Sequence, residues 1–244
     1  MDRTINLFYG MLQPLRSARN SFGFVLRKLR ALSQAESGSS GKWSTLLMQN
    51  GEAAKSQGSL IEMTGPKRGI TMTSPVLVEF DMRIRKGEQE EDDLQLIDGA
   101  IDCELTTPSR PSTNRINGDC GAVDITLARV PGAVEATIDV IISKVQSGFS
   151  LSLSSFVFAG GSHEGIELFC GTIGESCGLT RRYVIAVQMG SWMHLKFNVG
   201  QKGSEYDDLE RYCRFKADIH GCDCRQIILE HASISLKVTW LIVR

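Results

Sequence analysis

Hydrophobic and polar residues alternate strictly over one long stretch in the first half of the chain. From Val76 to Arg85, Val, Val, Phe, Met and Ile occupy every second position, and mostly charged residues lie between them. Side chains of a β-strand point alternately to its two faces, so this pattern predicts a strand with one face against a core and one face in water. Pro75 precedes the run, where a missing backbone N–H is tolerated.

The same period of two recurs along the rest of the chain. It predicts further strands at about 134–142, 149–158, 183–189, 193–199 and 234–242. In the second of these the phase slips at Ser154-Ser155, and Phe156 and Phe158 resume the apolar positions. One extra residue in a strand produces such a slip, so we predict a β-bulge there. We find no internal repeat.

This pattern predicts the fold class. Turn signals such as Asn117-Gly118-Asp119 and Pro131-Gly132 separate the strands. Eight or more strands without helical pattern between them predict an all-β protein, an antiparallel β-sandwich or a partly open barrel. We place this domain at 42–244, with its core from about residue 59. Trp240 is in phase with the last apolar strand, and we expect Trp43, Trp192 and Trp240 in the core or at its edge.

The first part of the chain has a different pattern. Apolar residues recur at helical spacing between Ser21 and Ala35, among many basic and few acidic residues, and predict a basic amphipathic helix. Residues 1–41 are thus predicted to be a helical extension that ends in the flexible linker Ser37–Gly41. An Arg-rich, acid-poor segment also fits an organellar transit peptide. The alternatives are a helix packed on the domain and a poorly ordered tail.

Composition excludes some classes of function. The chain has 27 basic and 28 acidic residues, a net charge of −1, which argues against broad nucleic-acid binding but leaves a local patch open. No apolar run approaches the roughly 20 residues of a membrane span. The seven cysteines are irregularly spaced, which favours reduced thiols in the cytoplasm or nucleus. We expect a protein partner and no membrane.

Several motifs resemble a known family. They are a Thr-Gly-Pro-x-Arg lead, a Pro-Val entry into a strand, an acidic loop, a Val-Glu-Ala-Thr strand and a closing strand with Trp, here at Thr64–Arg68, Pro75-Val76, Asp92-Asp93, Val134–Thr137 and Trp240. The chain resembles a plant domain of unknown function, abundant in grasses, over about residues 59–244. That domain also lies behind the ribosome-inactivating domain of the large jasmonate-induced protein of barley. The resemblance implies a stress or defence context and implies no catalytic residues.

One cluster of residues could hold a metal. Cys213, His220, Cys222, Cys224 and His231 lie close together in the sequence. Thiolates and imidazoles are good zinc ligands, and four of them could close a tetrahedral site. The spacing differs from that of common zinc fingers, so a loop with incidental cysteines is the alternative.

Three other groups could carry chemistry. His163-Glu164 could move protons, but no nucleophile is defined beside it, and Gly160-Gly161 more simply forms a hairpin turn. Glu52-Ala53-Ala54-Lys55 is a partial match to the Glu-Ala-x-Arg helix of ribosome-inactivating enzymes, with Lys in place of Arg. The third group is acidic and could form a calcium loop or an ordinary solvated loop, at Asp92, Asp93, Asp98, Asp119 and Asp124.

No residue set specifies a reaction. The sequence therefore predicts a non-catalytic binding or accessory module without a cofactor, linked to plant stress or defence. The alternatives are an rRNA N-glycosidase of the ribosome-inactivating type and a zinc-binding interaction module. The loops predicted at 86–98, 108–121 and 200–225 are the expected contact surfaces, since connecting loops carry most binding functions.

Overall fold

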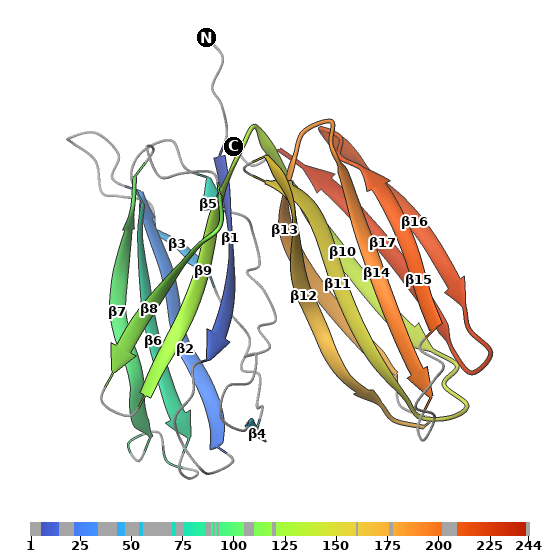
Figure 1. Ribbon diagram of the computed structural model, residues 1–244, viewed down its shortest axis with the longest axis horizontal. Coiled ribbons are helices and arrows are strands. Elements are labelled where there is room, and N and C mark those ends of the chain that lie inside the picture. The colour runs from blue at the N-terminus through green and yellow to red at the C-terminus, as the bar shows by residue number, and fades with distance from the viewer. Residues whose placement is uncertain are drawn as a thin grey trace. The chain divides into compact units, whose positions relative to one another are not determined.

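The computed structural model consists of β-strands over almost all the residues that it describes, which are 6–14, 22–33, 43–46, 54–55, 70–71, 76–85, 89, 91, 93–104, 110–118, 121–159, 161–175, 178–201 and 209–242 (Figure 1). Side chains are described from Leu77 onward, at most of these positions. These residues form seventeen strands and no α-helix. Every strand pair is antiparallel, which confirms the predicted fold class.

The chain divides into two compact units, Met1–Pro131 and Gly132–Arg244. Each unit contains two antiparallel sheets with buried apolar residues between them, the arrangement of a β-sandwich. This division differs from the predicted boundary between 1–41 and 42–244. The first 41 residues contribute strands to the first unit, because their backbone groups pair with strands that follow much later in the sequence.

The first unit has one sheet in the order β5-β1-β9-β8 and another in the order β3-β2-β6-β7, with β4 paired to β2. Its strands are β1 Asn6–Pro14, β2 Phe22–Ser33, β3 Trp43–Leu46, β4 Ala54–Lys55, β5 Ile70–Thr71, β6 Val76–Arg85, β7 Leu94–Cys103, β8 Ser112–Gly118 and β9 Gly121–Pro131.

The second unit has one sheet in the order β13-β10-β17-β16 and another in the order β12-β11-β14-β15. Its strands are β10 Ala133–Ser143, β11 Phe149–Ala159, β12 Ser162–Ile173, β13 Leu179–Gln188, β14 Trp192–Gln201, β15 Leu209–Lys216, β16 His220–Ile228 and β17 Ser233–Leu241.

The two units share one topology. When β1, β2 and β3 are matched to β10, β11 and β12, and β5 to β9 are matched in order to β13 to β17, both sheet orders coincide. Only the two-residue strand β4 has no counterpart among the described strands. The architecture is therefore repeated, although the sequence shows no internal repeat.

The predicted helix over Ser21–Ala35 is replaced by strand β2. Its register against β6 shifts between Leu26 and Lys28, which is the mark of a β-bulge. In a strand with a bulge, apolar residues recur every two positions on each side of the bulge, but three positions separate the last one before it from the first one after it. A spacing of three also fits a helix. The register pairs Lys28 with Asp81 and Arg30 with Glu79, so two of the basic residues that suggested an amphipathic helix have acidic residues as strand partners.

The predicted strands of the second unit have their apolar residues in its core. In β14, Met193, Leu195 and Phe197 are fully buried, and β10 and β17 follow the same alternation. Trp240 is buried as expected, and its indole N–H donates a hydrogen bond of 3.4 Å to Asp223. In the first unit, Val78, Phe80 and Met82 of β6 are buried, as the opening alternation predicted.

Strand β11 differs from its prediction in one respect. The alternation continues without a slip, so Ser155, Val157 and Ala159 are buried, whereas Phe156 and Phe158 point to the opposite face. A register shift does occur between Leu153 and Ser154, but the extra residue, Leu168, belongs to β12. The bulge was therefore predicted at the right place in the sheet and on the wrong strand.

Strands occupy much of what the structure describes in the segments predicted as contact loops. Strand β7 begins at Leu94, β8 occupies Ser112–Gly118, and β15 and β16 fill most of 200–225. The turn at Pro131-Gly132 is present, with Gly132 at a φ of 59°, a conformation that favours glycine. Of the charged residues in these segments, Asp98, Arg115, Arg214 and Arg225 belong to strands rather than to loops.

Candidate functional site

The outer face of the sheet β12-β11-β14-β15 carries an unusual set of side chains. Its inner face supplies the core of the second unit, so the alternation turns every other residue outward. On β14 these outward residues include Trp192, with an exposed fraction of 43%, and on β15 they include Tyr212, with 59%. We name this surface the aromatic–basic face and define it by Phe156, Phe158, His163, Trp192, His194, Lys196, Tyr212, Arg214 and Lys216.

The strand register arranges these residues in rows across the sheet. His163 is opposite Phe158, and Trp192 is opposite Lys216. In the next row Gly165, Phe156, His194 and Arg214 follow one another from β12 to β15. The outward positions of these two rows hold two cations, five rings and no carboxylate.

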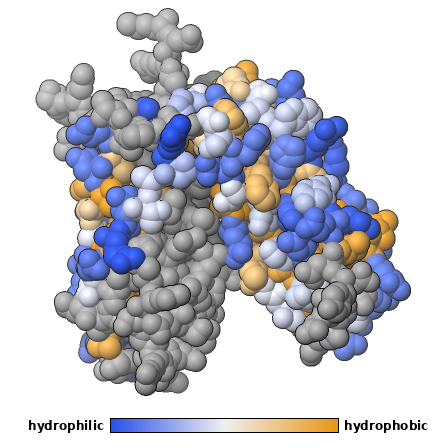
Figure 2. All heavy atoms as spheres, in the orientation of Figure 1, coloured by the Kyte–Doolittle hydropathy of each residue, from blue (hydrophilic) through white to orange (hydrophobic). Residues whose placement is uncertain are grey.

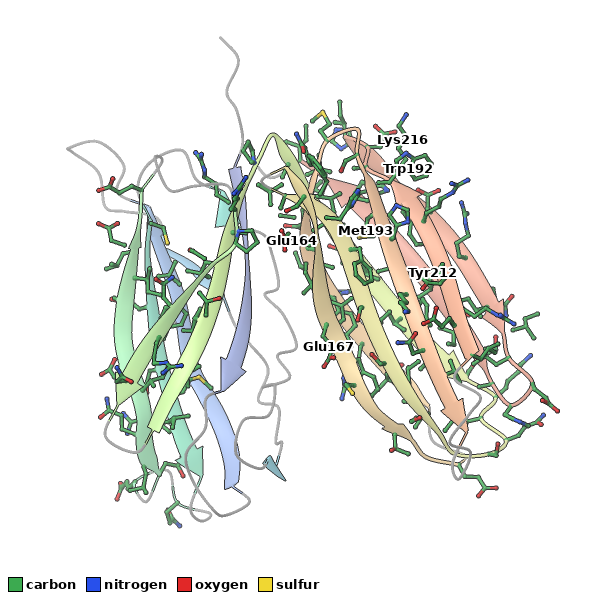
Figure 3. The ribbon with its side chains drawn as sticks, viewed as in Figure 1. Glu164, Glu167, Trp192, Met193, Tyr212 and Lys216 are labelled. Atoms are coloured by element: carbon green, nitrogen blue, oxygen red, sulfur yellow. The ribbon has the colours of Figure 1, made fainter. Side chains whose placement is uncertain are left out.

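Cations lie against the aromatic rings of this face. The guanidinium of Arg214 is 5.3 Å from the centre of the Trp192 ring, and the Lys196 ammonium is 5.6 Å from that of Tyr212. Such contacts stabilise the cation through the negative face of the ring. Figure 3 shows Trp192 and Lys216 near one end of the sheet and Tyr212 further along β15. The rings are thus held at the surface by charged neighbours.

The imidazoles belong to the same array. His163 makes an edge contact with Phe158 at 5.5 Å between ring centres and another with His194 at 6.4 Å. Both histidines are at least partly exposed. The proton-relay hypothesis for His163 and Glu164 has no geometric support, because Glu164 accepts a hydrogen bond of 2.5 Å from the Ser162 hydroxyl and no ion pair joins it to His163 among the described residues.

A glycine leaves room for one ring of the face. Gly165 is the direct partner of Phe156, and a Cβ built on Gly165 would come within 3.0 Å of the Phe156 ring. A side chain at this position would push the ring away from the sheet. Gly165 therefore sets the height of the Phe156 ring above β12.

In the other half of the face, the positive charge is compensated by a carboxylate. Lys196 forms an ion pair of 2.5 Å with Glu210, and the Tyr212 hydroxyl donates a hydrogen bond of 2.8 Å to the same carboxylate. The hydrogen bond from Lys196, followed by that from Tyr212, lowers the pKa of Glu210, and the bond to Glu210 raises the pKa of Lys196. The charge of Lys196 is therefore largely neutralised, whereas Arg214 and Lys216 form no ion pair with another described residue.

Carboxylates occupy the far edge of the sheet. Glu164 and Glu167 lie on β12, at the opposite edge from Tyr212 (Figure 3), and only Glu167 is in phase with the outward residues, because Glu164 is the register partner of the buried Val157. In Figure 2 hydrophilic residues are interspersed with hydrophobic ones over the second unit. The face is thus amphipathic, and its positive charge is concentrated on the side of β15.

The structure does not bring the five candidate zinc ligands together. His220 begins β16 and His231 follows its end, so roughly 25–30 Å of strand separates them. Cys222 and Cys224 are exposed on one face of β16. Cys213 lies on β15 in the other sheet, and burial raises the pKa of its thiol while Arg225 opposes that rise. Among the residues that the structure describes, no three His, Cys, Asp or Glu side chains form a group that could hold a metal ion.

The acidic candidates are also separated. Asp98 lies within strand β7 opposite Asp81, not in a loop, and lines a hollow of about 390 Å³ with Glu79 and Phe80. Asp93 precedes β7, whereas Asp92, Asp119 and the side chain of Asp124 fall outside the described residues. A shared calcium loop is therefore not formed by the part that is described.

The N-glycosidase motif lacks its helix where the structure describes it. Ala54-Lys55 is strand β4, paired with Phe22-Gly23 of β2. Glu52 and Ala53 lie outside the described residues. A motif without its structural context is weak, and the described part of this segment does not supply the expected helix.

Sequence reasoning missed most of the aromatic–basic face. Trp192 was expected in or near the core and is exposed, while the side chain of Trp43 lies outside the described residues. The signal was present on β14, where Trp192, His194 and Lys196 occupy the positions between the buried residues. Reading both phases of each strand would have found it.

The fold and this face define a class: an all-β protein of two sandwich units, one of which exposes an aromatic sheet face. The chain belongs to the family described as domain of unknown function (DUF6598), whose model matches residues 48–238. That match begins after β3, so β1 to β3 of the first unit precede it. No curated protein matches the chain.

Solved structures show only a distant likeness. Human GIVD cytosolic phospholipase A2 in complex with methyl gamma-linolenyl fluorophosphonate inhibitor and terbium chloride matches at 10% identity and a TM-score of 0.34, over 100% of this chain and 33% of that one. The two C2 domains of calcium-bound Extended-Synaptotagmin 2 match at 7% identity and a TM-score of 0.31, over 100% and 98%. The chain spans about a third of the phospholipase. Scores of this size support no inference about function.

Proposed function

We propose that this protein is a non-catalytic binding module whose ligand-binding surface is the aromatic–basic face. The exposure of Trp192 and Tyr212 beside Arg214 and Lys196 carries the proposal. Trp, Tyr and Arg are the residues most enriched in binding hot spots, since they combine a large apolar area with a polar or charged end. A rigid strand scaffold holds them in place, so little conformational entropy is lost on binding.

We place the module in plant stress or defence, in the cytoplasm or nucleus. The resemblance of the Thr64–Arg68 and Val134–Thr137 motifs to the grass domain supports the first part. Among the described residues, Cys103, Cys213, Cys222 and Cys224 are free thiols, which supports a reducing compartment. Among the described residues no helix is long and apolar enough to cross a membrane.

Affinity capture from stressed grass tissue tests the surface. The bait is the full chain, compared with a double variant, Trp192→Ala with Tyr212→Ala, and with the control Ile228→Ala. Among the described residues, Ile228 is the most exposed large apolar residue outside the face, and it lies on β16 of the other sheet. We expect a set of proteins or nucleic acids that the wild type and the control retain and the double variant loses. Identical retention by all three baits would refute the proposal.

A depurination assay on ribosomes tests the non-catalytic part. The purified chain should leave rRNA intact at concentrations at which a ribosome-inactivating enzyme depurinates all of the rRNA. Site-specific loss of an adenine would establish the N-glycosidase alternative instead. The assay needs no knowledge of the ligand.

A further inference from the structure

We infer that the aromatic–basic face binds single-stranded nucleic acid, with bases stacked on its rings and phosphates at Arg214 and Lys216. The inference rests on the proposed function of this face as a ligand-binding surface. The recognised chemistry is a planar base that carries a phosphate. A single strand and a free nucleotide both supply that chemistry.

Charge complementarity argues for this occupant. In the two rows that contain Trp192 and His194, the outward positions carry Arg214 and Lys216 and no carboxylate. Lys196 is paired with Glu210, so its charge is already compensated. The positive charge that no described carboxylate compensates therefore coincides with the aromatic half of the face. A polyanion is attracted there even though the whole chain has a net charge of −1.

The rings supply the second half of the argument. Proteins that bind single strands combine a positive surface with aromatic side chains on which bases stack. A four-stranded antiparallel sheet with outward aromatic residues on neighbouring strands can present several stacking surfaces at once. Here Phe156 and Phe158 lie on β11 and Trp192 on the adjacent β14. The Arg214 guanidinium over Trp192 adds a planar cation on which a base can also stack.

Duplexes and purely acidic polymers fit this surface less well. The faces of the bases in a duplex are covered by their neighbours, so the rings of Trp192 and Phe156 would find nothing to stack on. An acidic polypeptide would use the cations and leave the rings without partners. A preference for single strands over both competitors is therefore the distinguishing property.

Binding is measured with the full chain and fluorescently labelled twelve-nucleotide strands, oligo(U) and oligo(A), as RNA and as DNA. The competitors are AMP, a duplex of the same length and polyglutamate. We expect single strands to bind and both the duplex and polyglutamate to compete poorly. Competition by AMP at comparable concentration assigns the site to free nucleotides, and weak competition assigns it to strands. With two phosphate contacts, log K should fall with log salt at a slope of about −1.4.

Variants locate the site. Trp192→Ala should weaken binding about tenfold or more, because one stacked base is lost. Arg214→Ala with Lys216→Ala should weaken binding of all strands and flatten the salt dependence. Lys237→Ala, an exposed cation on β17 of the other sheet, should change neither. Trp192→Phe keeps a ring and should keep most of the affinity but lose the quenching of tryptophan fluorescence on binding, a readout that misfolding would not reproduce.

Three results would overturn the inference: no binding of any strand at about 100 μM, equal affinity of Trp192→Ala and wild type, or equal competition by duplex or polyglutamate. Its failure differs from failure of the proposed function. If capture from tissue recovers a protein that depends on the face while defined strands do not bind, the face is a protein-binding site, the partner class that we expected from the sequence. Circular dichroism and melting of each variant show that the comparison is between folded proteins.

Discussion

At the scale of single residues, a buried hydroxyl reveals how strictly the alternation is kept. Ser155 is fully buried in β11, and its hydroxyl has no hydrogen-bond partner among the described residues. A polar group that loses water without gaining a partner destabilises the folded state. The sequence placed Ser155 in a bulge, whereas the strand keeps it in the core phase.

The first prediction concerns this hydroxyl. Ser155→Ala should raise the free energy of unfolding by about 1 kcal/mol, because the substitution removes an unsatisfied group from the core. Ser154→Ala on the outer face of the same strand is the matched control and should change stability by less than about 0.5 kcal/mol. Urea unfolding measures both. A loss of stability in Ser155→Ala would mean that the hydroxyl has a partner.

Cysteine reactivity gives a second prediction at this scale. Burial, and then the charge of Asp102, raises the pKa of the Cys103 thiol to about 11. At pH 8 the thiolate fraction of such a group is about a thousandth, against about a quarter for an ordinary thiol of pKa 8.5. Cys103 should therefore react with iodoacetamide far more slowly than the exposed Cys222 and Cys224. Peptide mass spectrometry after timed alkylation measures the order in which the cysteines react. The alkylation rate of Cys103 should rise with pH up to about 11.

At the scale of elements, close contacts between strands require glycine at certain positions. Gly118 ends β8, and a Cβ there would overlap the carbonyl oxygen of Leu96 and lie 2.8 Å from its carbonyl carbon. Backbone atoms cannot move aside as a flexible side chain can. The two sheets of the first unit therefore approach each other at this point only because the residue is glycine.

Gly118→Ala should therefore lower the free energy of unfolding by about 2 kcal/mol or more. Gly99→Ala on β7 is the control, since its Cβ would meet only the Ile116 side chain at 3.4 Å. Thermal melting of the two variants compares them. Equal melting temperatures would show that the close approach at Gly118 is absent in solution.

Predictability differed between elements for a physical reason. Strands with an unbroken alternation, such as 76–85 and 234–242, were predicted because burial on one face leaves a direct trace in the sequence. Strand β2 was not, since the register shift between Leu26 and Lys28 makes its apolar spacing resemble a helix. The aromatic–basic face was missed because outward residues follow no burial rule, and Trp192 was expected in the core or at its edge.

At the scale of the whole molecule, the N-terminal strands are part of the first unit. In the sheet orders, β1 lies between β5 and β9, and β2 lies between β3 and β6. Removal of an interior strand exposes the backbone groups of both neighbours. A helical extension, by contrast, could be removed without this loss.

The fourth prediction follows from these positions. Deletion of residues 1–41 should unfold the first unit and leave the second, which has its own core and sheets. Limited proteolysis followed by mass spectrometry should yield a resistant fragment that begins near Gly132. In the intact chain, 76–131 should resist as well. Protection of 76–131 in the deleted chain would show that β1 and β2 are dispensable.

The sequence by itself determined the all-β antiparallel class and, where the alternation is unbroken as at 76–85 and 234–242, the strands and their inward residues, because alternation is a local property that burial imposes on each strand. Only the tertiary structure decided that the chain forms two units of one topology, that β1 and β2 belong to the first, and that Trp192, Tyr212 and Arg214 meet on one surface. Strand pairing joins residues that are distant in the sequence. The composition of an exposed face therefore depends on which strands become neighbours, and no single strand records that choice.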